Sequence, residues 1–241
     1  MDTSIYVGLS GQMALDQRMS TIAQNIANAN TVGYRAGGVD FATIISNTPT
    51  HETAFVSEGK NHMSELSGGF TRSGNPLDVA VQGNGFLGIQ SPSGTYYSRD
   101  GRLSLNAGGQ LVNTSGHNLL DSGGSPIQLD PSAGAVTINK DGTIFQSGKR
   151  FGQIGLFSVD TRAGFRRVEN SGVVPVTTPE PISDHSSSGI LQGFVEESNV
   201  NAVTEMVRLI QVTRAFEAAS SLTDKASEAQ RNAIQTLGSH S

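Results

Sequence analysis

The chain has 241 residues, with 21 acidic against 16 basic side chains and a net charge of −5. Lys and Arg form no cluster dense enough to follow a phosphate backbone, so we expect no nucleic-acid partner. The absence of cysteine excludes disulfide scaffolds, thiolate catalysis and cysteine-ligated zinc.

The first residues lack the basic region and the apolar run of a secretory signal. No stretch of the chain approaches the ~20 apolar residues of a membrane span. We therefore expect no membrane span, and we expect that a protein with this start leaves the cytosol without a cleaved signal peptide.

A long amphipathic helix is predicted within residues 1–36. Apolar and small residues alternate in steps of three and four, the spacing of one helical face aimed at another helix: Ile5, Gly8, Gln12, Leu15, Met19, Ile22, Ile26 and Ala29. The five large apolar members represent about 7 kcal/mol of burial at ~1.5 kcal/mol each. Asn28, Asn30 and then Gly33, which we place at the C′ position, favour the end of this helix.

Residues 37–75 lose this periodicity, and we interpret them as an extended or irregular linker arm. Residues 76–198 are predicted to form an all-β domain, because glycine recurs there every seven to nine residues, as in short strands joined by tight turns. Hairpin turns are predicted at Asn84-Gly85, Asp100-Gly101 and Asp141-Gly142. The predicted strands are 78–82, 86–90, 102–105, 110–113, 135–138, 143–146, 153–159 and 190–196.

A second long helix is predicted in residues 199–241, capped by Asn199 or Asn201. Its stripe repeats the alternation at Leu209, Val212, Phe216, Ala219, Thr223, Ala226, Gln230, Ala233 and Leu237, and no Gly or Pro interrupts it before Gly238. At ~1.5 Å per residue, this helix exceeds 50 Å in length. Such long stripes could pack on the protein's own core. Alternatively, the two helices pack on each other, on helices of neighbouring subunits, or on both.

The predicted fold class is therefore α+β, with long terminal helices forming a coiled-coil-like helical domain around a central all-β domain of short antiparallel strands. We expect the helical stripes and the asparagines at the first helix end to form an assembly interface. Its residues are Ile5, Leu15, Met19, Ile22, Ile26, Asn28, Asn30, Leu209, Val212, Phe216, Ala219 and Leu237.

No motif in the sequence indicates catalysis, a cofactor or a metal. Residues 83–88 (GNGFLG) match a dinucleotide fingerprint, but Pro92 and Gly94 leave no room for the helix that must begin at those glycines. The five histidines are scattered singly, without metal-ligand spacing. The carboxylates each have a simpler role beside a turn or a strand end. We therefore predict a structural protein that is not an enzyme.

Four segments resemble the flagellar rod and hook family. Residues 22–35 (IAQNIANANTVGYR) are similar to its N-terminal signature, residues 75–88 (NPLDVAVQGNGFLG) and 97–112 (YSRDGRLSLNAGGQLV) to its β-domain, and residues 191–217 to its closing motif. The resemblance covers nearly the whole chain except 37–74 and 160–189. Met1, Asp2, Ile5 and Tyr6 resemble the start of the proximal-rod subfamily.

This resemblance implies a subunit of the bacterial flagellar basal-body rod, a hollow shaft that transmits torque. It implies that copies of the chain and other proximal-rod and distal-rod subunits are partners, with the flagellar type III export apparatus as a partner in transit. It places the protein in the flagellar basal body, within the periplasm. The alternatives are a distal-rod subunit, whose longer insert after the first helix is missing here, and a cell-wall-binding protein or adhesin that uses the β-domain.

Overall fold

The computed structural model describes residues 2–48, 51–169 and 171–238. The chain divides into two compact units. Unit 1 comprises Met1–Ala27, Gly37–His62 and Asn201–Ser241, and unit 2 comprises Asn28–Ala36 and Met63–Val200. The chain therefore has two helices and a β-rich middle of short antiparallel strands, which confirms the α+β class.

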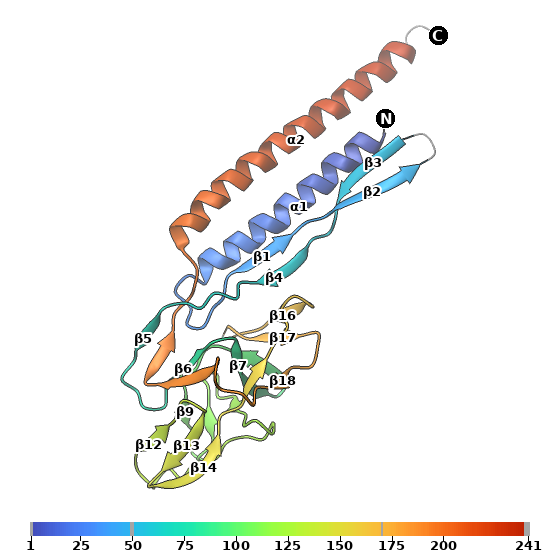
Figure 1. Ribbon diagram of the computed structural model, residues 1–241. Helices are drawn as coiled ribbons and strands as arrows, with labels where there is room; N and C mark the ends of the chain where they lie inside the picture. The colour runs from blue at the N-terminus through green and yellow to red at the C-terminus, as the bar shows by residue number, and fades with distance from the viewer. Residues whose placement is uncertain (1, 49–50, 170, 239–241) are drawn as a thin grey trace. The chain divides into compact units, whose positions relative to one another are not determined.

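Unit 1 contains both helices, α1 (Asp2–Ala27) and α2 (Ala202–Gly238). They lie side by side and antiparallel (Figure 1). The Asn201 side chain accepts a hydrogen bond from the Thr204 backbone N at 3.0 Å. Of the two predicted cap residues, Asn201 is therefore the one that caps α2. Asn199 instead accepts from the Ala36 backbone N at 2.7 Å and donates to the Leu66 carbonyl.

The helix α1 ends earlier than expected. The structure places its last residue at Ala27, and the Thr31 backbone N donates to the Asn28 carbonyl at 3.1 Å in the turn that follows. Gly33 lies six residues beyond the helix end and is not its C′ residue. Its positive φ of 69° serves a close approach instead, because an added Cβ would lie 2.5 Å from the backbone of Arg99 and Asp100.

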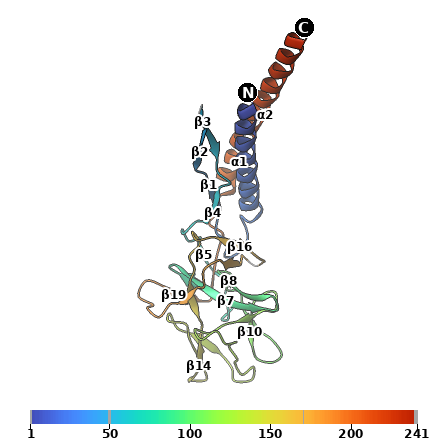
Figure 2. The ribbon, with the colours of Figure 1, turned by 90° about the vertical axis from the view of Figure 1, so that its right-hand side faces the viewer.

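Strands also occur in the segment that we expected to be an irregular arm. The strands β2 (Thr43–Thr48) and β3 (His51–Val56) pair antiparallel, and β1 (Gly37–Asp40) pairs with β4 (Lys60–Met63). Figures 1 and 2 show the β2–β3 pair running beside α1. The Val56 backbone N lies 3.4 Å from the Ser10 hydroxyl of α1, which accepts its hydrogen bond.

Unit 2 is built from short antiparallel strands. Its largest sheet has the order β16-β17-β8-β7-β11-β10-β9, with β15 pairing both β7 and β18. These strands are β7 (Gly85–Ser91), β8 (Gly94–Ser98), β9 (Ser104–Leu105), β10 (Leu111–Val112), β11 (Asn118–Leu119), β15 (Leu156–Ser158), β16 (Phe165–Arg167), β17 (Val173–Pro175) and β18 (Glu180–Pro181).

Three smaller sheets complete unit 2. They pair β12 (Val136–Ile138), β13 (Thr143–Gln146) and β14 (Lys149–Gln153); β6 (Val79–Gln82) with β19 (Gly189–Gln192); and β5 (Phe70–Arg72) with β20 (Phe194–Glu196). The expected β-domain, 76–198, lies within unit 2, which also includes 28–36 and 63–75.

One of the three predicted hairpin turns is confirmed. Asp141-Gly142 joins β12 to β13, which pair directly, and Gly142 has a φ of 82°. The turn at Asn84-Gly85 instead joins β6 to β7, which pair with different strands, and Asp100-Gly101 connects β8 to β9, which also pair elsewhere. These two hairpin predictions were wrong because a turn signal fixes the local bend and not the partner strand.

The apolar core lies in unit 2, where strands such as β6 and β7 are buried at several consecutive residues. Its fully buried members include Val79, Leu87, Ile89, Leu111, Leu119, Ile144, Ile154, Leu156 and Ile190. A second small cluster joins Met63, Phe86 and Val173. Unit 2 thus buries its own apolar surface, whereas in unit 1 the described buried apolar side chains are Ile22 and Val212.

Candidate assembly surface

The two helices of unit 1 contact each other through the predicted stripes. Ile22 and Val212 are buried, at 5% and 6% exposure. The Gln12 side chain donates to the Thr223 hydroxyl at 3.4 Å, and the Thr213 hydroxyl lies 3.5 Å from the Met19 sulfur. The inner sides of the two stripes therefore face each other within one chain.

A glycine permits the close approach of the helices near the N-terminus. A Cβ added to Gly8 would lie 2.7 Å from the Thr223 hydroxyl oxygen, closer than side chains pack. Gly8 and Thr223 are both stripe positions. The small member of one stripe therefore makes room for a hydroxyl of the other, which explains why the α1 stripe is not uniformly apolar.

The end of α1 is held by a polar contact to the start of α2. Asn25 is buried, and its amide nitrogen donates to the Glu205 carboxylate at 3.2 Å and to the Gly37 carbonyl at 2.9 Å. Its amide oxygen accepts from the Gly37 backbone N at 2.9 Å. The Glu205 carboxylate also pairs with Arg208 at 2.6 Å. These bonds fix the relative level of the two helices along their length.

The structure locates all but one of the twelve predicted interface residues. Ile22 and Val212 are buried in the helix pair, and the half-buried positions are Ile5, Leu15, Met19, Ile26, Asn28, Leu209, Phe216 and Ala219. Asn30 is exposed. Leu237 lies in α2, but its side chain is outside the described residues. Their contacts with other subunits stay a prediction.

Sequence reasoning missed a second set of apolar side chains on the same helices. Large apolar residues are exposed on α1 and on the first three turns of α2: Tyr6, Leu9 and Met13, and Val203, Met206, Val207 and Ile210. The α2 group also follows a three-and-four spacing, so the signal was present in the sequence. Periodicity could not show which of the two rows faces α1.

The Gly-Tyr-Arg signature at 33–35 is internal to unit 2. Tyr34 and Arg35 are buried, and the Gly33 backbone N donates to the Glu196 carbonyl at 2.7 Å. The Arg35 guanidinium pairs with the Glu196 carboxylate at 3.1 Å and donates to the Glu65 carbonyl at 2.7 Å. The signature therefore joins the two ends of unit 2 rather than presenting a surface.

A second arginine completes this buried cluster. Arg99 lies 3.3 Å from the other Glu196 carboxylate oxygen and donates to the carbonyls of Val81 and Gly83. Burial lowers the pKa of Arg99 to about 10, the nearby Glu196 charge raises it, and the Arg35 charge lowers it. Its guanidinium also lies 5.2 Å from the centre of the Phe86 ring. One carboxylate thus serves two buried guanidinium groups.

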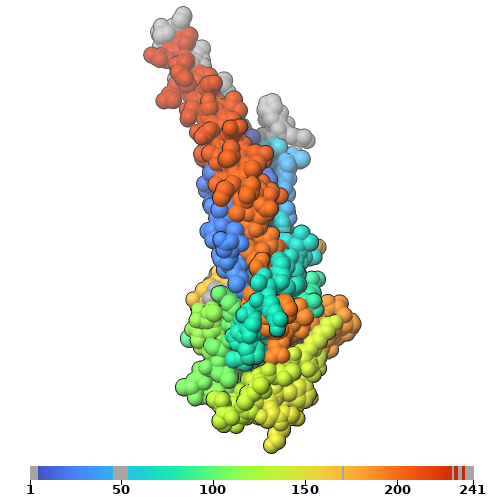
Figure 3. Space-filling view, turned by 90° about the vertical axis from the view of Figure 1, so that its left-hand side faces the viewer, coloured from blue at the N-terminus to red at the C-terminus, as the bar shows by residue number. Residues whose placement is uncertain are grey.

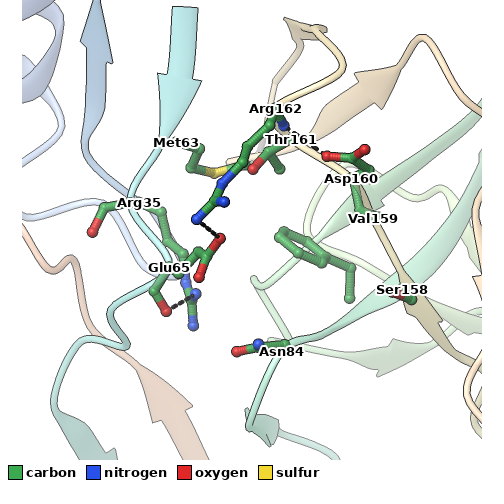
Figure 4. A pocket seen from close by; sticks show the side chains of 11 residues that line it. Arg35, Met63, Glu65, Asn84, Ser158, Val159, Asp160, Thr161 and Arg162 are labelled. Carbon is green, nitrogen blue, oxygen red and sulfur yellow. Dashed lines mark hydrogen bonds and ion pairs between the residues drawn. The ribbon is translucent and has the colours of Figure 1, made fainter. Parts of the chain in front are cut away.

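A pocket of about 400 Å³ opens beside this cluster in unit 2 (Figure 4). Its wall includes Met63, Phe86 and Val159 together with charged groups. Arg162 pairs there with the Glu65 carboxylate at 2.9 Å, as the figure shows. The opposite charges of Glu65 and Arg162 therefore satisfy each other within the pocket.

Three other kinds of function were considered for the described residues: metal binding, membrane insertion and dinucleotide binding. Among the residues that the structure describes, no three His, Asp or Glu side chains gather as metal ligands. Neither helix, in its described part, is long and apolar enough to cross a membrane. The strand β7 begins at Gly85, inside the glycine-rich segment 83–88, so the helix that a dinucleotide site needs does not begin there.

Three family models match the chain. The model described as flagella basal body rod protein matches residues 5–35, the flagellar hook protein FlgE/F/G D1 domain matches residues 80–146, and the flagellar basal body rod FlgEFG protein C-terminal matches residues 191–236. The matched segments contain most of α1 with the Gly-Tyr-Arg signature, much of the unit 2 core, and most of α2.

Curated relatives extend the match to the full length. A flagellar basal-body rod protein FlgF from Mesorhizobium japonicum is 49% identical over 241 residues, covering 100% of both chains. The FlgF of Rhizobium meliloti is 44% identical, covering 99% of each chain. A FlgG from Bacillus subtilis is 28% identical, covering 91% of this chain and 93% of its own.

The relatives are structural rod proteins and not enzymes, and this chain is likewise a structural subunit of the flagellar basal-body rod. The chain belongs to the flagellar basal-body rod protein family, in which it is most like FlgF.

Proposed function

We propose that the chain, as a structural subunit of the flagellar proximal rod, is joined to its neighbours by its two terminal helices. The observation that carries this proposal is the apolar surface left open on unit 1. Met13 is 65% exposed on α1 and Val203 is 73% exposed on α2. Unit 2 has a buried core of its own and needs no partner for that purpose.

The predicted stripe has a double role in this proposal. Its inner members hold α1 to α2, as the burial of Ile22 and Val212 supports. Its half-buried members, such as Ile26 and Phe216, keep part of their apolar surface open. Contact with neighbouring helices would bury that remaining surface and give the coiled-coil-like packing expected of the assembled helical domain.

The cellular setting is also a proposal, supported by family membership. We place the protein in the periplasmic part of the basal body, reached through the flagellar type III export apparatus. Its partners there are copies of itself and other proximal-rod and distal-rod subunits. We further propose that residues 76–198 act as the β-domain, separate from a helical domain made by 1–36 and 199–241, with 37–75 connecting them.

Two substitutions test the role of the stripe. Ile26→Asp on α1 and Phe216→Asp on α2 should each prevent rod assembly, because a carboxylate replaces half-buried apolar surface. Motility in soft agar and recovery of the chain in isolated basal bodies measure assembly. Glu217→Gln, an exposed neighbour of Phe216, is the matched control and should leave motility unchanged.

The same variants must leave unit 2 folded. Limited proteolysis of the purified chain should trim the helices and leave a resistant fragment of the β-domain in wild type and variants alike. Normal rods from both the Ile26→Asp and Phe216→Asp cells would contradict the proposal.

A further inference from the structure

The first turns of α2 carry apolar side chains on two opposite sides. Leu209 and Val212 face the α1 side, where Val212 is buried. Four others point outward and are 73%, 50%, 51% and 54% exposed: Val203, Met206, Val207 and Ile210, here called the outer ridge. Figure 3 shows this side of α2 uncovered within unit 1. Exposed apolar side chains that gather on one part of a surface are typical of an interaction site. The outer ridge therefore needs a cover that its own unit does not supply.

A groove of about 770 Å³ lies on another side of the helix pair. It runs along α1 past Leu9 and Met13, which are 48% and 65% exposed. The end of β3 at Val56 and the Phe216 ring of α2 form its other walls. We call this the α1 groove. Its lining combines these apolar side chains with polar ones, among them the exposed carboxylates of Asp16 and Glu58.

We propose that the outer ridge of one copy packs into the α1 groove of a second copy of this chain. This inference rests on the proposed role of the helices in assembly and names which surfaces meet. The exposed Arg214, four residues beyond Ile210, continues the line of the ridge, whereas the exposed carboxylates of Asp16 and Glu58 line the groove. The charges are therefore complementary between ridge and groove, as they are at specific interfaces.

The contact is heterologous, because the ridge and the groove are different surfaces of the same chain. Each copy keeps a free ridge and a free groove after pairing with one neighbour. Such head-to-tail contacts generate a ring or an open helix rather than a closed dimer. The surfaces of unit 1 thus carry the pattern that a tubular assembly requires.

The outer ridge and the α1 groove lie at different positions along the helix pair, so two copies joined by this contact are shifted relative to each other along the helix axis. Asn25 contacts Glu205 and Gln12 contacts Thr223, so the ridge lies level with the last turns of α1. The groove lies about 12–15 residues nearer the N-terminus, which is ~20 Å at ~1.5 Å per residue. Neighbours that run parallel are therefore staggered by roughly 20 Å along their helices.

Cysteine crosslinking in assembled rods tests this contact, because the native chain has no cysteine. The full-length Met13→Cys/Ile210→Cys chain replaces the native copy in flagellated cells, and isolated basal bodies are treated with a short bismaleimide. We expect a ladder of dimers, trimers and larger species. Each single variant should give no crosslinked pair of copies. Leu9→Cys/Val207→Cys is a second pair, so the test does not depend on one set of positions.

The matched control is Met13→Cys/Ser221→Cys. Ser221 is exposed on the same side of α2 as Ile210, but 11 residues further along the helix. This control should give no ladder. A ladder from it would mean that neighbours are not staggered, and dimers from Ile210→Cys alone would mean a symmetric contact. A crosslink from Ile210 to a different rod protein in place of a second copy would also overturn the inference.

Motility measured without crosslinker separates this inference from the proposed function. Motile cells whose rods contain the double variants but give no ladder would overturn the ridge-and-groove contact alone. The assembly role of the helices would still stand on the results for Ile26→Asp and Phe216→Asp.

Discussion

Replacing Glu196 by Gln should strongly destabilise unit 2. The Glu196 side chain is 1% exposed and faces Arg35 and Arg99, which are 3% and 0% exposed. The amide keeps the shape of the carboxylate but leaves two buried guanidinium groups without a counter-charge. Removing one partner of a buried ion pair costs about 3–5 kcal/mol. That loss is a large share of the ~5–15 kcal/mol that stabilises a typical domain.

Urea unfolding of the full chain measures this loss. Three of the four tyrosines, at 34, 96 and 97, lie in unit 2, so near-ultraviolet circular dichroism reports on that unit. A loss of 3–5 kcal/mol should lower the urea midpoint by about 2 M at ~1–3 kcal/mol per M. Arg162→Gln is the control, because it breaks an ion pair whose side chains are 78% and 60% exposed. This control should cost less than about 1 kcal/mol. Equal midpoints for the two variants would refute the reasoning.

Three further changes test other parts of the fold. Gly33→Ala should lower the unfolding free energy of unit 2 by more than Gly74→Ala in urea titrations, because both glycines have positive φ but only Gly33 lies against other backbone atoms; equal losses would contradict the close approach. Ile22→Ala should cost about 2–4 kcal/mol in the stability of the helix pair, measured by hydrogen exchange of α1 amides, and unchanged exchange would show that this site is not packed. Hydrogen bonds from Thr143 lower the pKa of Asp141, so its stabilising effect is present above its ordinary pKa of about 4 and is lost as the pH falls through the lowered value. Asp141→Asn should therefore reduce the urea midpoint at pH 7 but hardly at pH 2, and an equal reduction at both would sink this reading.

Much of the β-rich middle could be predicted from the sequence. The predicted strand 143–146 coincides with β13, and the predicted 190–196 contains β20 and most of β19. Recurring glycines and turn dipeptides such as Asp141-Gly142 are local signals, which is why these elements were found. Strand partners were not found, because pairing such as β6 with β19 joins residues more than 100 positions apart.

The segment 37–75 shows a different limit of prediction. The strands β2 and β3 were missed because the segment is rich in Ser, Thr, Gly and Asn, and because apolar side chains such as Ile44 and Ile45 are exposed. The segment was recognised only as non-helical. Exposed strands leave no burial period to detect, so a sequence without apolar alternation looks irregular.

The sequence predicted that the helices carry apolar faces that need a partner, but it could not predict which of these faces is buried within the chain. The stripe through Ile22 and Val212 was identified by its spacing, and the structure shows that these two residues face inward. The row through Met206 and Ile210 has the same spacing and remains exposed. Spacing indicates that a helical face needs a partner, while the choice between an internal and an external partner depends on tertiary packing. The family, by contrast, was predicted from motifs, and the comparisons confirm it.

The buried cluster around Glu196 also has a mechanical consequence. The chain crosses between its two units after residues 27, 36, 62 and 200. Within unit 2, three of these four connections are bonded to one another. Arg35 pairs with Glu196, the Ser64 backbone N donates to the Ala36 carbonyl, and the Ala36 backbone N donates to the Asn199 side chain. Because these connections are fixed to one another within unit 2, a force that reaches this unit along the chain is divided among three connections instead of acting on one.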